Sequence, residues 1–75
     1  MQVPSKLFSY EESIFSKFPV ILRLVEKEPL PIKEIYSQTS RHFKSPADFI
    51  ECLDALFTIS KINYDENNEV IIYVD

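Results

Sequence analysis

Few residues of this chain combine the types and the spacing that acid–base or metal chemistry requires. Glu11 and Glu12 are adjacent, so on a helix their carboxylates point about 100° apart and do not face one proton between them. The single histidine, His42, is ten positions away from the single cysteine, Cys52, and a zinc site needs about four ligands close together. We therefore predict no catalytic residue and no metal site.

The thiol of Cys52 is a potential nucleophile. Cys52 lies among Phe49, Leu53 and Leu56, and no neighbouring base in the sequence would lower its pKa. Such apolar neighbours favour a buried cysteine that packs as a small hydrophobic side chain. We predict a structural role for Cys52.

A calcium-like pattern of polar residues begins at Asp65 and continues at Asn67 and Glu69. Val70 then stands where a calcium loop requires glycine, which favours a polar hairpin turn instead. Because the whole chain contains no glycine, it also has no phosphate-binding loop of the P-loop or dinucleotide type. We predict that the protein binds no cofactor and is not an enzyme.

The composition is that of one small folded domain, which we assign to residues 1–75. Apolar residues make up 45% of the chain, too many for a disordered segment, yet no apolar run approaches the roughly 18 residues of a membrane span. A single cysteine and the lack of a signal-peptide core after the N-terminus indicate the cytoplasm. We expect no membrane partner.

Helical spacing and one proline predict an interrupted helix in the first third of the chain. We expect a helix to begin at Tyr10, because a capping box precedes it. An apolar stripe at helical spacing covers residues 14–25 and contains Pro19, which cannot donate a backbone hydrogen bond inside a helix. We therefore expect a break near Phe18, with Pro19 in the first turn of a second helix.

The remaining elements are predicted from caps, prolines and β-branched residues. They are two helices followed by two strands, over residues 31–43, 46–60, 62–65 and 69–74. Pro31 biases the preceding Leu30 toward an extended conformation. Any positive-φ position in the hairpin turn should fall on Asn67 or Asn68, because asparagine tolerates the left-handed region.

This order of elements predicts the fold class. A chain that is mainly α with a C-terminal β-hairpin, with a short connection between its last two helices, matches a winged helix-turn-helix. The competing folds are a plain three-helix bundle with a disordered tail, which the β-rich C-terminus disfavours, and a different small α+β arrangement.

The distribution of charge indicates protein binding rather than DNA reading. Residues 46–75 have a net charge of −6 and residues 1–45 a net charge of +2. A DNA-reading helix directs cationic and amide side chains at bases and phosphates, whereas the helix predicted over residues 46–60 offers Asp48, Glu51 and Asp54. We predict a protein-binding adaptor without direct DNA binding; the alternative is a small transcriptional regulator or nucleic-acid-binding protein.

The helix predicted over residues 46–60 has an apolar arc about 180° wide, against the ~100° that a surface helix typically buries. Either this helix is packed on two sides within the domain, or another chain covers part of the arc. A domain this small without disulfides or metal often needs a partner, which would be a second copy or another subunit. The candidate interface residues are Tyr10, Phe15, Lys17, Phe18, Ile50, Phe57 and Tyr73.

Four short stretches of the chain carry a family resemblance. They are Ser9-Tyr10-Glu11-Glu12-Ser13-Ile14, Ser16-Lys17-Phe18-Pro19, Phe49-Ile50-Glu51, and Leu53-Asp54-Ala55-Leu56-Phe57 leading to Lys61-Ile62. Together they resemble the small middle-component proteins of bacterial ABC-three-component systems. The resemblance implies a winged helix-turn-helix adaptor or regulator that works with an SMC-like ABC ATPase and a third, variable component in antiviral defence. It assigns no residue a chemical role.

Overall fold

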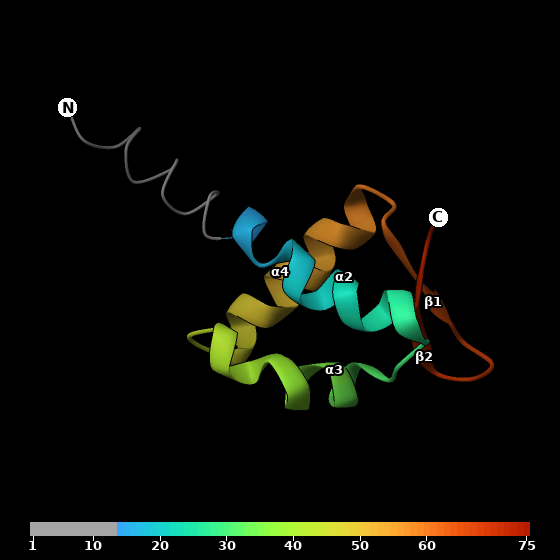
Figure 1. Ribbon diagram of the computed structural model, residues 1–75, viewed down its shortest axis with the longest axis horizontal. Helices are drawn as coiled ribbons and strands as arrows, with labels where there is room; N and C mark the ends of the chain where they lie inside the picture. The colour runs from blue at the N-terminus through green and yellow to red at the C-terminus, as the bar shows by residue number, and fades with distance from the viewer. Residues whose placement is uncertain (1–13) are drawn as a thin grey trace.

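The computed structural model describes residues 14–75, which are mainly helical and end in an antiparallel hairpin (Figure 1). The elements are α2 (Phe18–Lys27), α3 (Ile32–Thr39), the 3₁₀ helix η1 (Ser40–His42), α4 (Pro46–Thr58), β1 (Ile62–Asp65) and β2 (Val70–Tyr73). This order confirms the predicted fold class and is consistent with a winged helix-like arrangement.

A break separates α2 from the helical residues 14–16, as predicted. Lys17 lies in a turn, and α2 begins at Phe18 with Pro19 in its first turn. Proline is tolerated there because the amide of a first-turn residue has no partner within the helix. The predicted helix start at Tyr10 lies outside the described residues.

The connection between α2 and α3 pairs with the hairpin. The amide of Leu30 donates to the carbonyl of Ile71 at 3.2 Å, and the amide of Ile71 donates to the carbonyl of Leu30 at 2.7 Å. Leu30 is therefore extended, as its place before Pro31 predicts. This bridge ties the connection between the two helices to β2.

The predicted single helix over residues 31–43 is wrong at its C-terminal end. The α-helix ends at Thr39, and η1 replaces its last turn. The hydroxyl of Thr39 donates to the carbonyl of Ile35 at 2.8 Å, so this side chain takes part in the hydrogen bonding of the helix end. Phe43, expected to be helical, is extended.

The start of α4 is as predicted. Ser45 is the N-cap, and its Oγ accepts a hydrogen bond from the amide of Asp48 at 3.3 Å. Pro46 occupies the first turn, and Asp48 places a negative charge near the positive end of the helix dipole. These local signals favour a helix start at this position.

The C-terminus of α4 shows a left-handed residue. The helix ends at Thr58 rather than about Ser60, and Ser60 has a φ of 64°. The amide of Lys61 donates to the carbonyl of Leu56 at 2.9 Å, and the amide of Ser60 donates to the carbonyl of Phe57 at 3.0 Å. This pair of bonds is a Schellman motif, in which serine takes the position that glycine usually fills.

The hairpin turn differs from prediction in one position. Its positive-φ residue is Glu69, at 58°, rather than Asn67 or Asn68. The carboxylate of Asp65 accepts hydrogen bonds from the backbone amides of Asn67 and Asn68 and from the side-chain amide of Asn68. These bonds fix the first part of the turn. The left-handed residue comes last in the turn, and β2 covers Val70–Tyr73 instead of the predicted residues 69–74.

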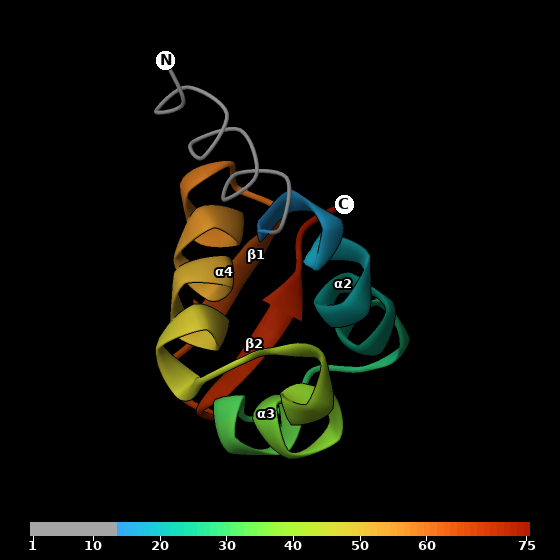
Figure 2. The same ribbon diagram turned by 90° about the vertical axis from the view of Figure 1, so that its left-hand side faces the viewer.

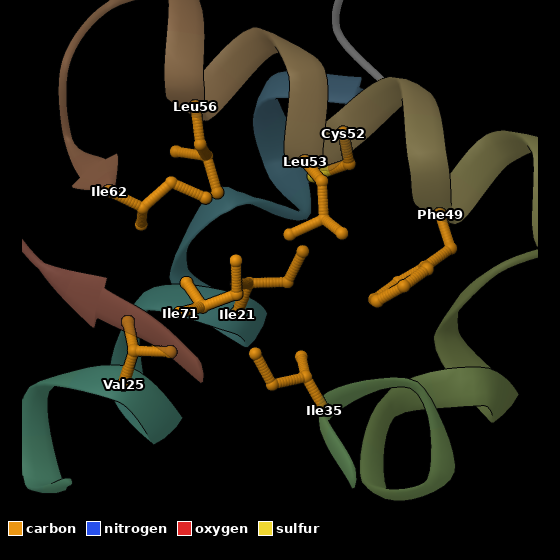
Figure 3. Packing of buried hydrophobic residues seen from close by; sticks show 9 residues of the cluster. All are labelled: Ile21, Val25, Ile35, Phe49, Cys52, Leu53, Leu56, Ile62 and Ile71. Atoms are coloured by element: carbon orange, nitrogen blue, oxygen red, sulfur yellow. The ribbon is translucent and has the colours of Figure 1, made fainter. Parts of the chain in front are cut away.

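One hydrophobic core joins all the elements. In Figure 2 the hairpin lies between α4 on one side and α2 on the other, with α3 at one end. Figure 3 shows the side chains of α4 directed at those of α2, α3 and β2. The buried residues are Ile21, Val25, Ile35, Phe49, Cys52, Leu53, Leu56, Ile62 and Ile71. Within residues 14–75, no helix has the length and apolar character to cross a membrane.

Candidate protein-interaction surface

The apolar arc of α4 is covered in its middle and exposed at its two borders. Phe49 and Leu53 belong to the core, whereas Ile50 is 45% exposed and Ile59 is 51% exposed. Ile59 is the C-cap residue that follows α4, and at 100° per residue it lies nearly opposite Ile50 around the helix axis. Packing within the domain therefore accounts for the middle of the arc and leaves an exposed apolar side chain on each flank.

Three of the predicted interface residues also have contacts within the domain. Phe18, Phe57 and Tyr73 are half-buried and pack against the core. The Tyr73 hydroxyl also forms a hydrogen bond with Glu26, and the negative charge of that carboxylate raises the pKa of Tyr73 above its usual value. These side chains are needed by the fold, and each leaves only part of its surface for a partner.

The segment before α2 contacts α4. The thiol of Cys52 lies 3.9 Å from the carbonyl oxygen of Ile14 and can donate to it. Phe15 is 57% exposed, and its ring meets that of Phe18 edge-on, with 5.4 Å between ring centroids. Lys17 is half-buried in the turn. Tyr10, the remaining predicted interface residue, lies outside the described residues.

The interface prediction did not include three exposed apolar side chains, Ile32, Ile59 and Tyr64. Ile59 lies within the predicted arc of α4. Tyr64 is two residues after Ile62 in β1 and pairs across the hairpin with Ile71. Residues two apart in a strand point to the same face, so Tyr64 lies on the sheet face that carries these two core residues. Because successive side chains of a strand point to opposite faces, the position of Tyr64 two residues after the apolar Ile62 is the sequence signal that could have placed it on the core-facing side of the sheet.

The surface of α4 beside Ile50 is acidic. Glu51 follows Ile50, and Asp54 lies one helical turn further on; both are exposed. The helix sequence contains no lysine or arginine. Exposed basic residues instead occupy the connection between α3 and α4, at Arg41 and Lys44. The face of α4 that would read DNA in a winged-helix regulator thus carries negative charge.

The fold buries the thiol of Cys52. Cys52 is fully buried, and the loss of solvent raises the pKa of its thiol from 9.0 to about 11, an effect that nearby Lys17 only partly offsets. Among residues 14–75, no group of three or more His, Cys, Asp or Glu side chains could hold a metal ion. Exposed apolar and acidic side chains lie close together on α4, at Ile50, Glu51 and Asp54.

Comparison with known proteins adds one finding. A family model described as "ABC-three component (ABC-3C) system Middle Component 7" matches residues 3–71, which include α2, α3, η1, α4, β1 and the start of β2. Searches of curated proteins and of solved structures found no match.

Proposed function

Because this chain belongs to the middle component 7 family of ABC-three component systems, we propose that it is a non-enzymatic adaptor subunit that binds the ABC ATPase of such a system. The family, which the sequence resemblance predicts, is confirmed. A middle component is part of a multi-component system, so membership implies partner proteins. The partners that we propose are an SMC-like ABC ATPase and a third, variable component, acting in the cytoplasm in defence against phages.

The exposed face of α4 is the observation that carries the adaptor role. The side chain of Ile50 is almost half exposed to solvent, although the preceding residue of the same helix, Phe49, is buried in the core. The neighbouring Glu51 and Asp54 are acidic. An apolar side chain with charged neighbours is typical of the border between an interface core and its polar rim.

The competing function is a small transcriptional regulator. Arg41 and Lys44 lie at the connection that leads into α4, a place from which phosphates could be contacted. However, seven acids against one base in residues 46–75 oppose the approach of DNA to α4 and the hairpin. The two functions therefore differ in their expected affinity for duplex DNA.

We expect the isolated protein to show no affinity for duplex DNA tighter than about 1 µM at physiological salt, because its acidic α4 and hairpin repel phosphates. Fluorescence anisotropy with a random duplex and with a duplex from its own operon measures this. Sub-micromolar binding, with an affinity whose logarithm falls steeply with the logarithm of salt concentration, would favour the regulator and contradict the adaptor.

A further inference from the structure

We propose that the ABC ATPase docks on the flank of α4 that carries Ile50, using a surface in which lysine or arginine side chains surround an apolar contact. This inference rests on the adaptor function proposed above and names the surface that performs it. The surface consists of Ile50 and Asp54 on α4, with Tyr64 on the adjoining strand β1; we call it the α4 face.

Exposed apolar side chains occur on both of the adjoining elements α4 and β1. Ile50 is 45% exposed and Tyr64 is 40% exposed. Strand β1 contacts α4, and Tyr64 lies on the same sheet face as the buried Ile62. Phe57, seven residues after Ile50, lies on the same flank of the helix and is half-buried. A partner could therefore cover aliphatic and aromatic surface together.

The charge of the α4 face selects the occupant. Asp54 lies one turn after Ile50 and is exposed; a partner that covers Ile50 must approach this carboxylate. No lysine or arginine of α4 compensates for it. An acidic partner would be repelled, whereas a basic side chain at the rim of the partner gains a favourable interaction and a faster encounter.

The same charge disfavours two other occupants. A symmetric dimer through this face would bury two copies of Asp54 in one interface with no basic side chain of α4 to pair with them, because a two-fold interface uses the same patch on both subunits. DNA would bring phosphates toward the same carboxylates. A basic protein surface remains as the occupant that this face favours.

The test measures the affinity between the full chain and the ABC ATPase encoded beside it. The two proteins are purified separately and titrated against each other by calorimetry. Two variants alter the α4 face: Ile50→Arg removes the apolar contact and adds a repelling charge, and Asp54→Lys reverses the acidic charge. Each has a matched control. Ile59→Arg makes the same change at the C-cap of α4, nearly opposite Ile50 around the helix axis, where the side chain is 51% exposed, and Glu66→Lys reverses an exposed charge in the hairpin turn.

The wild-type chain is expected to bind, with an affinity that falls as salt rises. Ile50→Arg and Asp54→Lys should each weaken binding by about tenfold or more, while both controls bind as the wild type does. Circular dichroism melts should show all four variants folded, because every altered side chain is exposed.

Other results would overturn the inference in distinguishable ways. If the wild-type chain binds and the two α4-face variants bind equally well, the ATPase uses a different surface and the adaptor function stands. If Ile59→Arg weakens binding as much as Ile50→Arg, binding does not depend specifically on the side of α4 that carries Ile50, and the assignment of the docking site to the α4 face is wrong. Self-association of the chain alone that Ile50→Arg abolishes would make a second copy the occupant. No binding by the wild-type chain would remove both proposals.

Discussion

Replacing Phe49 by alanine should lower the free energy of unfolding by about 3–5 kcal/mol, the loss expected when a buried aromatic side chain leaves a cavity. Phe49 is almost fully buried. Its ring packs against the rings of Tyr36 and Phe43, with centroids 4.9 and 5.5 Å away. The substitution therefore removes the contact through which α4 packs against α3 and the segment that follows it.

Chemical denaturation followed by circular dichroism measures this loss. Small domains have a total stability of about 5–15 kcal/mol, so the F49A variant should unfold at a much lower denaturant concentration. Ile50→Ala is the matched control, because Ile50 is the next residue of the same helix and is 45% exposed; it should lose less than about 1 kcal/mol. Equal losses for the two variants would contradict the packing of α4 described above.

The thiol of Cys52 should react about 100-fold more slowly in the folded protein than in the denatured chain at pH 8. Burial raises the pKa of this thiol from 9.0 to about 11, so the thiolate fraction at pH 8 falls from roughly one tenth to roughly one thousandth. Because the folded state holds the proton more tightly, the reactive thiolate appears only as the pH rises toward the higher pKa. Steric protection by the core slows the reaction further.

Stopped-flow measurement of the reaction with a disulfide reagent tests this prediction between pH 7 and pH 10. The same chain in concentrated guanidinium chloride provides the reference rate of an exposed cysteine. A folded-state rate equal to the denatured rate would show that Cys52 is accessible, and the segment containing Ile14, whose carbonyl lies near the thiol, would then not cover it.

Local signals in the sequence predicted the helix boundaries that depend on local chemistry. Pro19 could occupy only a first turn, and Ser45 with Pro46 formed a capped helix start; both boundaries are found where they were expected. The pairing partner of Leu30 was not predictable in this way. Its extended conformation follows from Pro31, but the choice of Ile71 as partner depends on how the helices pack.

Side-chain hydrogen bonds that sequence patterns do not reveal occur at two of the boundaries that were missed. The α-helix ends early, at Thr39, and the hydroxyl of this residue donates a hydrogen bond to the carbonyl of Ile35. In the hairpin, Asp65 binds the amides of Asn67 and Asn68, so the left-handed position falls on Glu69. In both cases a side chain competes for backbone groups, and the outcome depends on geometry rather than residue type.

The candidate interaction surface was predictable only in part. The wide arc of α4 indicated that some of its apolar residues lie outside the core, and Ile50 is one of them. Phe57 faces the same flank but is half-buried against the core. Helical angle alone cannot separate the two, because burial depends on which neighbouring element covers each position.

Co-expression with the neighbouring ABC ATPase tests the central claim most directly. The tagged chain should retain the ATPase through affinity purification and size-exclusion chromatography, and light scattering should give a mass equal to the sum of both subunits in whole-number ratio. Recovery of the chain as a stable monomer without the ATPase, from cells that contain both proteins in soluble form, would contradict its role as an adaptor.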